Sequence, residues 1–327
     1  MTDERQLLQL LADGYFHSGQ DLASKLEISR SAVWKRLQHL QESLGFELYA
    51  VSGKGYKLAK PIQLLDRDTL KVTLQESINT TCLPEIDIYL TTDSTNKQAL
   101  EYARQSPQTP RLVLAERQTA GRGRRGREWL SPFGGNLYLS LYWWFDAMPP
   151  SIGSLSLVIA TILAKQLEAI GVPRCELKWP NDVRYQGKKL AGILLEMQGE
   201  AGGGCGVVIG MGINLDMQGH ATETIDQPWI DVKNITGKAT DRNELAAHMV
   251  ANLIIILNKI SEEDFSILLE EWQYRDVLCG QQVTLELPNE TLKGIARGID
   301  AQGAFLLEQN GQIQCFYSGE VSVRLAE

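Results

Sequence analysis

The first sixty residues pass from a helical to a strand-like spacing of hydrophobic positions. Three helices are predicted: one with the stripe Leu7, Leu8 and Leu11, one from a capping box of Ser18 and Asp21 to Leu26, and one that opens at Ser29 and carries Val33, Leu37 and Leu40. Residues 46–51 then alternate, Ser52–Gly55 form a turn, and residues 56–58 return. The pattern predicts a helix-turn-helix followed by a β-hairpin, the plan of a winged helix, with a boundary at Pro61.

The middle of the chain, residues 63–276, mixes strand and helix patterns. Residues 136–145, 191–197 and 207–215 predict strands, while residues 151–170 are apolar on nearly every side and predict a buried helix that ends at Gly171. Glycines between the last two strands fit a hairpin turn: Gly199, Gly202, Gly203, Gly204 and Gly206. We therefore expect an α+β region with an antiparallel or mixed sheet.

The last fifty residues hold short strand patterns separated by turn residues. We predict strands at 282–287, 292–300, 304–308, 312–317 and 321–325, with turns at Pro288-Asn289, Gln302-Gly303 and Asn310-Gly311. Strands this short and this closely spaced predict a small β-barrel. The chain as a whole is predicted to be α+β and multidomain, with domains at residues 1–62, 63–276 and 277–327.

The charge is acidic overall but basic in one segment. The 327 residues carry a net charge of -8, yet the segment from Ile28 to Lys60 holds six cations and two anions, a net charge of +4. Polar or cationic side chains face away from the apolar stripe of the third helix, and one more cation lies in the hairpin turn. We predict that these residues contact DNA: Ser29, Arg30, Ser31, Trp34, Lys35 and Lys54. A small packing domain with solvated cations is the alternative.

Two further features bear on location and redox state. The chain shows no charge-free apolar run of about 18 residues, and the charged start Met1–Arg5 has no apolar segment after it. We therefore expect no transmembrane helix, no secretory signal and a cytoplasmic protein. The five cysteines are scattered, at Cys82, Cys175, Cys205, Cys279 and Cys315, and are predicted to be free buried thiols.

The segment Gly121–Trp129, Gly-Arg-Gly-Arg-Arg-Gly-Arg-Glu-Trp, is the strongest local signal. It contains G-x-G-x-x-G, but a dinucleotide-binding turn opens a helix, and Ser131-Pro132 and Gly134-Gly135 prevent one here. Glycines let backbone N–H groups approach an anion, and guanidinium groups add paired donors. We predict a flexible anion-binding loop; a basic surface loop is the alternative. The chain has no G-x-x-x-x-G-K-[ST] motif, which disfavours a P-loop enzyme.

Two weaker segments also carry chemistry. Lys178-Trp179-Pro180-Asn181-Asp182 precedes Lys188–Gly192, so Asn181 and Asp182 could hold Mg²⁺ and Lys189 could pair with an anionic substrate. An Asn-Asp hairpin turn with solvated lysines explains that spacing equally well. Thr92–Asn96 places hydrogen-bonding side chains after an apolar strand, and alone it is best explained as a helix N-cap.

These segments, in this order, resemble a known family. With Asn136–Tyr138, Glu196 and Gly212–Asn214 they resemble the bifunctional biotin protein ligases that also repress the biotin operon, and the resemblance covers nearly the whole chain. It implies a winged helix, a catalytic domain with a mixed sheet related to class II aminoacyl-tRNA synthetases, and an SH3-like barrel. The implied reaction joins biotin and ATP, with Mg²⁺, into biotinyl-5'-AMP and transfers biotin to a lysine of the biotin carboxyl carrier protein of acetyl-CoA carboxylase. Biotinyl-5'-AMP is also implied as corepressor, promoting a homodimer on operator DNA.

The resemblance assigns roles residue by residue. Biotin-binding positions are Ser94, Thr95, Asn96, Gln118, Gly121, Arg122, Gly123, Arg124 and Lys189. Positions for ATP or the adenylate are Arg122, Arg124, Arg127, Trp129, Lys178, Asn181, Asp182, Asn214 and Arg324. Lys189, Arg124 and Asp182 are expected to be catalytic, and Asn181 and Asp182 to hold Mg²⁺. One departure is Asp216, where the family usually has asparagine, and it leaves the adenine contact of Asn214 unproved.

Two other functions remain open at this point. A ligase for another acyl group, such as lipoate, would leave Ser94 and Gln118 unpaired, because lipoate lacks the ureido group of biotin. A DNA-binding biotin sensor without ligase activity would not need Arg122–Arg127, Asp182 and Lys189. The residues present favour the ligase that is also a repressor.

Overall fold

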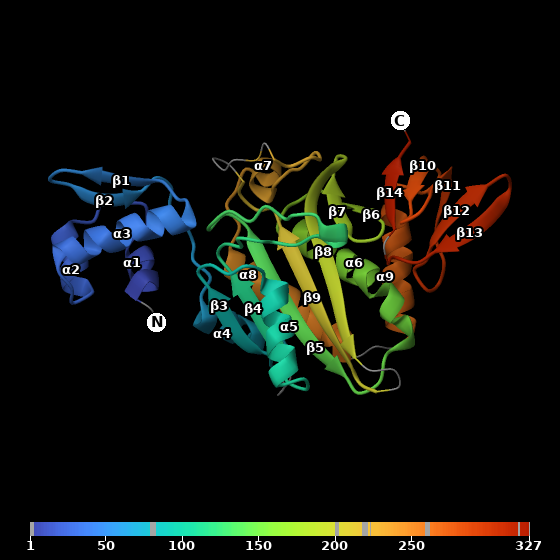
Figure 1. The fold of residues 1–327 in the computed structure, drawn as a ribbon, viewed down its shortest axis with the longest axis horizontal. Coiled ribbons are helices and arrows are strands. Elements are labelled where there is room, and N and C mark those ends of the chain that lie inside the picture. The colour runs from blue at the N-terminus through green and yellow to red at the C-terminus, as the bar shows by residue number, and fades with distance from the viewer. Residues whose placement is uncertain are drawn as a thin grey trace.

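The computed structural model describes residues 3–78, 83–199, 203–217, 222, 224–258, 262–319 and 321–326. Cys82 and Gly202, named above, lie outside these residues. The molecule is elongated, with a small N-terminal unit at one end, a large central sheet, and a small C-terminal sheet at the other end (Figure 1).

The N-terminal unit is a helix-turn-helix with a hairpin, as its sequence predicts. It contains α1 (Asp3–Leu11), α2 (Gly19–Lys25), α3 (Arg30–Leu44), β1 (Leu48–Val51) and β2 (Gly55–Leu58). The predicted stripes are buried, and Ser18 and Ser29 cap α2 and α3 by accepting hydrogen bonds from the backbone N–H groups of Asp21 and Ala32. Gly45, at φ 75°, ends α3 in the left-handed conformation that favours glycine.

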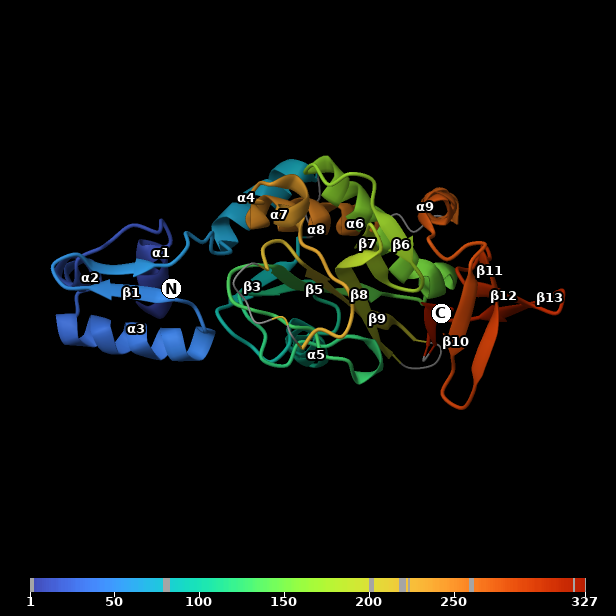
Figure 2. The ribbon, with the colours of Figure 1, turned by 90° about the horizontal axis from the view of Figure 1, so that it is seen from above.

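The central sheet is mixed, which confirms the predicted α+β class. Its seven strands follow the order β3 (Glu85–Tyr89), β4 (Arg111–Ala115), β5 (Leu137–Phe145), β9 (Cys205–Ile213), β8 (Lys188–Gly199), β7 (Asp182–Tyr185) and β6 (Glu176–Lys178). Among the pairings between these seven strands, as far as the structure describes them, only that of β3 with β4 is parallel. Helices α4 (Arg67–Ser77), α6 (Leu155–Ala169) and α8 (Arg242–Asn258) cover one face, and α5 (Thr95–Gln105) covers the other (Figure 2). The short α7 (Val232–Thr236) follows the β9 region, and α9 (Glu262–Arg275) packs on α6.

The predicted helix at 151–170 divides into a 3-10 turn, Pro150–Ser154, and α6. Within the described residues, Pro150–Ala169 is the one helix long and apolar enough to cross a membrane, and 67% of its most apolar window is buried inside the protein. Eleven of the fifteen α6 residues are buried, including Leu157, Ile159 and Leu163 in the main core. Packing in the core therefore explains why this helix is apolar.

The structure changes two expectations from the sequence, one on the glycines of the hairpin and one on the cysteines. Gly204 and Gly206 do more than form a turn, because a Cβ on Gly204 would collide with the ring of Trp144 and a Cβ on Gly206 with the ring of Tyr142. Cys175 and Cys205 are buried free thiols as predicted, but Cys279 and Cys315 are free and exposed, which corrects the expectation of burial. Cys315 lies on β13 (Gln312–Phe316), an edge strand whose residues are largely exposed.

The C-terminal unit is a five-stranded antiparallel sheet. Its order is β13, β12 (Phe305–Gln309), β11 (Thr291–Ile299), β10 (Gln282–Glu286) and β14 (Ser322–Leu325). The five predicted strands are confirmed. Trp179 joins this unit to the central sheet, since its indole Nε1 donates to the Gly303 carbonyl oxygen at 3.1 Å and its ring lies 5.2 Å from that of Phe305.

Candidate active site

A cavity of about 360 Å³ lies where the central sheet meets the Gly121–Trp129 loop and the C-terminal sheet. Its lining includes residues from all three segments that the sequence singled out: Ser94, Thr95, Asn96, Gln118, Arg122, Gly123, Arg124, Arg127, Trp129, Lys178, Asn181, Asp182 and Lys189. Segments about a hundred residues apart in the chain therefore form one site. Volumes of this order suit a small organic ligand.

Neutral polar side chains form one end of the cavity, which we call the floor: Ser94, Thr95, Asn96 and the half-buried Gln118 line it, and the buried Ser140 is hydrogen-bonded to Thr95 and Asn96. The Gln118 amide oxygen accepts from the backbone N–H of Thr95 at 2.9 Å, and its Nε2 donates to Ser131 at 2.9 Å. The Ser140 hydroxyl lies 2.8 Å from Thr95 Oγ1 and 2.6 Å from Asn96 Oδ1. This end can supply both donors and acceptors to a neutral polar ligand group.

Ser94 is the N-cap residue that precedes α5, but its hydroxyl makes no capping hydrogen bond. The first helical N–H, that of Thr95, donates instead to the Gln118 amide oxygen, and the Asp93 carboxylate accepts from the Ser94 backbone N–H at 2.7 Å and from Lys97 Nζ at 2.6 Å. Lys97 also lowers the pKa of Asp93 to about 2. The segment Thr92–Asn96 thus contains the N-cap position of a helix, but the Ser94 side chain is 3% exposed and lines the cavity.

The Gly121–Trp129 loop covers the cavity and is called the cover below. A Cβ on Gly121 would lie 2.4 Å from the Trp129 carbonyl oxygen, and the two segments are joined by a hydrogen bond from the Trp129 backbone N–H to the Gly121 carbonyl oxygen. Gly123 N–H donates to the Arg127 carbonyl oxygen at 2.7 Å, and Gly126 has φ 71°. Glycine is thus required for close backbone approach as well as for flexibility.

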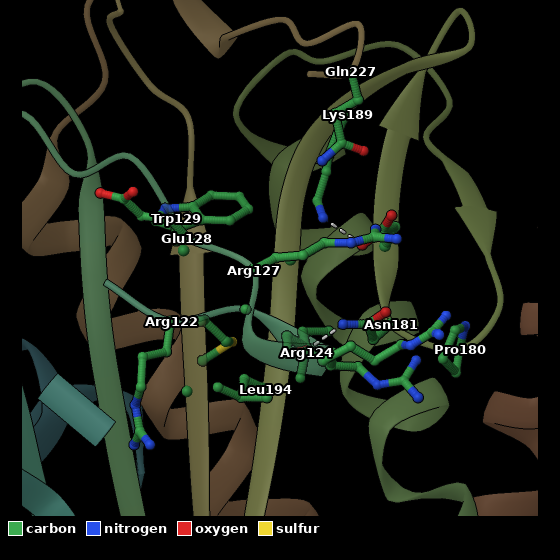
Figure 3. A pocket seen from close by; sticks show the side chains of 18 of the residues that line it. Arg122, Arg124, Arg127, Glu128, Trp129, Pro180, Asn181, Lys189, Leu194 and Gln227 are labelled. Atoms are coloured by element: carbon green, nitrogen blue, oxygen red, sulfur yellow. Dashed lines mark hydrogen bonds and ion pairs between the residues drawn. The ribbon is translucent and has the colours of Figure 1, made fainter. Parts of the chain in front are cut away.

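The arginines of the cover have different partners. Arg122 forms an ion pair with Glu196 on β8 at 2.8 Å. Arg124 donates to the carbonyl oxygens of Ser318, Gly319 and Val321 in the C-terminal sheet region, and burial lowers its pKa. Arg125 pairs with Glu286 on β10 at 3.2 Å. Figure 3 shows Arg124 and Arg127 pointing to the side of Asn181, and Arg122 pointing to the opposite side.

The centre of the cavity concentrates positive charge. Lys189 Nζ lies 2.7 Å from Asp182 Oδ1 and 5.3 Å from the centre of the Trp129 ring. Burial is the main cause that lowers the pKa of Lys178 to about 8, with smaller contributions from the nearby cations Arg184, Lys189 and Arg127, and Asp182 opposes this shift. Such a cluster can hold two anionic groups close together, which would otherwise repel each other.

A second, smaller cavity of about 100 Å³ adjoins the first beyond Trp129 and Lys189. Asn214, Met217 and Trp229 also line it. Trp129 Nε1 is buried and has no hydrogen-bond partner among the described residues, and its ring occupies space that a Cβ on Gly212 would block at 2.4 Å. A slot that combines two tryptophans with polar side chains suits a flat heterocycle with hydrogen-bonding groups.

The residues present fit a magnesium ion held mainly by a substrate. The described residues contain no cluster of three or more His, Cys, Asp or Glu side chains. Asp182 supplies one carboxylate beside Asn181, whose Nδ2 donates to the Ile193 carbonyl oxygen at 2.6 Å. Mg²⁺ typically takes one or two carboxylates together with phosphate and water oxygens, and Asp182 and Asn181 match that mode.

Three of the assigned residues lie elsewhere. Gly121 lines a hollow that shares Arg122–Glu128 residues of the cover with the main cavity, and Asn214 lines the second cavity, where its Nδ2 donates to the Lys189 and Ile230 carbonyl oxygens. Arg324 lines neither cavity; it is 61% exposed and pairs with Glu286 at 3.0 Å. Asp216 pairs with Lys233 at 2.6 Å and does not replace Asn214 in the cavity wall.

Several lining residues have no sequence signal of their own. They come from β8, β9, the region after residue 221 and the C-terminal strand: Ile193, Leu194, Gly210, Met211, Thr224, Asp226, Gln227, Val321, Ser322 and Val323. The residues predicted to contact DNA lie in the N-terminal unit and do not line either cavity: Ser29, Arg30, Ser31, Trp34, Lys35 and Lys54 are all exposed. Trp34 is 50% exposed, which is unusual for tryptophan outside an interaction surface.

Comparisons with known proteins agree with this geometry. Residues 88–214 match the biotin/lipoate A/B protein ligase family, residues 278–324 match the C-terminal domain of biotin protein ligases, and residues 3–57 match a helix-turn-helix domain. The chain is 43% identical to the bifunctional ligase/repressor BirA of Salmonella typhimurium, over 98% of this chain and 97% of that protein. It is 40% identical to BirA of Escherichia coli, again over 98% and 97%. The biotin protein ligase of Aquifex aeolicus, solved with biotin and ATP, is 29% identical with a TM-score of 0.63, covering 75% of this chain and all of that one.

The central sheet and its cavity thus define the class of the biotin and lipoate protein ligases. With the helix-turn-helix domain and the full-length similarity, the chain belongs to the family of the bifunctional ligase/repressor BirA.

Proposed function

We propose that this protein is an ATP-dependent biotin ligase and a DNA-binding repressor. The observation that carries the ligase function is the meeting, in one cavity, of a neutral hydrogen-bonding floor and a cationic centre formed by Lys189, Lys178 and Arg127. In the first step a carboxylate oxygen of biotin attacks the α-phosphorus of ATP, and the bond to the β-phosphate oxygen breaks, which gives biotinyl-5'-AMP and diphosphate. In the second, a carrier lysine amine attacks the acyl carbon, AMP leaves, and the amine loses a proton.

The residues divide this work by charge. Ser94, Thr95, Asn96 and Gln118 receive the ureido end of biotin, and backbone N–H groups of Gly121–Arg124 with Lys189 receive its carboxylate. Lys178 and Arg127 face the phosphates, and Trp129 and Asn214 hold adenine in the second cavity. Asp182 and Asn181 would hold Mg²⁺ together with the phosphate oxygens, and the ion would supply further neutralisation of charge on the triphosphate. The guanidinium of Arg124, which binds C-terminal carbonyl oxygens, acts by holding the cover closed.

The test is ATP-dependent transfer of biotin to a purified biotin carboxyl carrier domain, with lipoate and a lipoyl domain as the parallel arm. We expect transfer of biotin and none of lipoate, because lipoate leaves the floor unpaired. Equal transfer of lipoate would favour the general acyl ligase. Biotin binding without transfer or diphosphate release would favour the sensor.

The repressor function rests on the exposed basic face of α3 and the hairpin. We propose that the hairpin acts as the wing of a winged helix, and that residues 1–62 form the DNA-binding domain, 63–276 the catalytic domain and 277–327 an SH3-like domain. A chain lacking residues 1–62 should lose operator binding and keep some ligase activity. Specific operator binding by the truncated chain would contradict this assignment.

We further propose that biotinyl-5'-AMP promotes a homodimer and that the dimer binds a palindromic operator in the cytoplasm. One helix-turn-helix reads few base pairs, and two copies gain specificity from half-site spacing. The ligand can drive dimerisation only through a higher affinity for the dimer-competent state. Sedimentation with and without biotin and ATP tests this. Tight operator binding by a monomer would refute it.

A further inference from the structure

A buried ion pair lies outside the cavity, where the linker from the N-terminal unit enters the central domain. Glu116 follows β4 and Arg242 opens α8, and Arg242 Nη2 lies 2.7 Å from Glu116 Oε2. Their side chains are 0% and 4% exposed. A buried ion pair of this kind adds little to the net stability of the fold. Its contacts therefore suggest a role in positioning the segments that it joins.

One side of the pair binds the linker. The backbone N–H of Arg242 donates to Gln63 Oε1 at 2.9 Å, and its guanidinium donates to the Gln63 carbonyl oxygen. The Leu65 backbone N–H donates to Glu116 Oε1 at 2.6 Å. Leu64 packs in the core of the N-terminal unit and Leu65 in the central core. The ion pair of Glu116 and Arg242 therefore binds the linker at the point where the chain passes from one core to the other.

The other side reaches the wall of the second cavity. Arg242 Nη1 donates to the Asn136 carbonyl oxygen at 3.0 Å. The Asn136 side chain accepts from the Leu215 backbone N–H at 2.8 Å and donates from Nδ2 to Met217 Sδ at 2.7 Å. Met217 and the neighbouring Asn214 line the second cavity with Trp129. A continuous series of contacts therefore runs from Gln63 through Arg242 and Asn136 to the cavity wall.

We propose that Arg242, held by Glu116, is a positioning residue that aligns the nucleotide cavity with the linker of the DNA-binding unit. The inference rests on the proposed function for the identity of the nucleotide. The floor is held by its own hydrogen bonds among Gln118, Thr95, Ser140 and Asn96, none of which involves Arg242 or Asn136. Loss of the alignment therefore weakens ATP binding and leaves biotin binding intact.

The experiment compares three variants of the full chain. Arg242→Lys keeps a charge for Glu116 but loses the fork that reaches both Gln63 and Asn136. Gln63→Ala removes only the side-chain contact from the linker. Glu168→Gln is the matched control, because Glu168 pairs with Arg275 in the same domain away from both cavities. The Michaelis constants for ATP and biotin are measured by diphosphate release, and ATP binding is measured by calorimetry.

We expect Arg242→Lys to raise the KM and the dissociation constant for ATP about tenfold, the effect of one lost charge-assisted hydrogen bond. Gln63→Ala should raise both about threefold, Glu168→Gln should change neither, and the KM for biotin should stay constant throughout. The inference would be overturned if the KM for biotin rose together with the KM for ATP, or if neither the KM nor the dissociation constant for ATP rose. If Arg242→Lys does not fold, Gln63→Ala decides. If wild-type protein releases no diphosphate, the proposed function fails, and calorimetry with ATP still decides the inference.

Discussion

The floor and the cover of the cavity are built on different principles. The floor comes from α5 and the strands of the central sheet, and its neutral side chains are buried and hydrogen-bonded to one another. The cover has no packed core of its own, and its position depends on guanidinium groups that reach three separate partners: Glu196, the carbonyl oxygens near residue 319, and Glu286. A rigid floor favours selection of one substrate, and a cover held by polar contacts can open and close around it.

The largest expected effect on activity comes from Lys189, which lies between the floor and the cover. Lys189→Ala removes the cation that faces the attacking carboxylate and leaves Asp182 without its partner at 2.7 Å. We expect adenylate formation to fall about a hundredfold or more, which corresponds to a loss of ~2–4 kcal/mol of transition-state stabilisation. Diphosphate release measures the loss, and circular dichroism checks that the variant is folded. A folded variant with near wild-type release would show that Lys189 does not act on the carboxylate.

The next effect tests the rigidity of the floor. Gly210 lies on β9, and a Cβ there would be 1.9 Å from Asn96 Oδ1. Gly210→Ala must displace Asn96, and we expect biotin affinity to fall by more than about tenfold. Gly153→Ala is the matched control, since its nearest neighbour would be at 3.7 Å. Calorimetry with biotin makes the comparison, and an unchanged affinity in Gly210→Ala would mean that the floor adapts.

The sequence predicts the local parts of this molecule well. The leucine stripes and the serine caps of the N-terminal unit act within four residues, and the structure confirms them. Ser94 shows the limit of local prediction, because nothing in the local sequence says that the side chain of Gln118, 23 positions from Thr95, rather than the Ser94 hydroxyl accepts from the first N–H of α5.

The parts that the sequence does not reveal are long-range. Glu116 and Arg242 are 126 positions apart, and Arg124 meets carbonyl oxygens almost 200 positions away. A backbone carbonyl has no sequence signature, so the contact between the cover and the C-terminal sheet could not be predicted. Arg324 was assigned to the ATP phosphates by resemblance; its pairing with Glu286 offers another role, and the assignment stays a prediction.

The third prediction loosens the cover. Arg124→Gly removes contacts to the carbonyl oxygens of Gly319 and Val321 and adds a further glycine to the loop. We expect biotinyl-5'-AMP to escape about tenfold faster, because a charge-assisted donor contributes ~1.5 kcal/mol or more. Dissociation of radiolabelled adenylate measures the rate, and labelling of bystander lysines should increase with it. An unchanged rate would show that the cover does not retain the intermediate.

The fourth prediction uses pH to separate the phosphate side from the floor. Burial lowers the pKa of Lys178 to about 8, so the side chain is cationic at pH 7 and largely neutral at pH 9. A phosphate nearby favours the cationic form, so ATP affinity should fall about fivefold as the pH rises through 8, while biotin affinity stays level. Lys178→Arg should remove the dependence, because arginine remains charged. A pH profile that persists in Lys178→Arg would assign the titration to another group.

The fifth prediction has the smallest expected effect and concerns a single surface contact of the cover. It asks whether exposed ion pairs, unlike the buried hydrogen bonds of the floor, help to hold the cover in place. Glu286 pairs with both Arg125 and Arg324, at 3.2 Å and 3.0 Å, and is 28% exposed. Pairs this accessible to water contribute at most ~1 kcal/mol, so Glu286→Gln should speed adenylate release only about two- to threefold. Glu308→Gln is the matched control, since Glu308 pairs with Arg297 in the same sheet, is 25% exposed and does not contact the cover. The effect of Glu286→Gln should disappear at high salt, where exposed pairs are screened. If the two variants release adenylate equally at low salt, Glu286 does not hold the cover, and the contacts of Arg124 alone connect it to the C-terminal sheet.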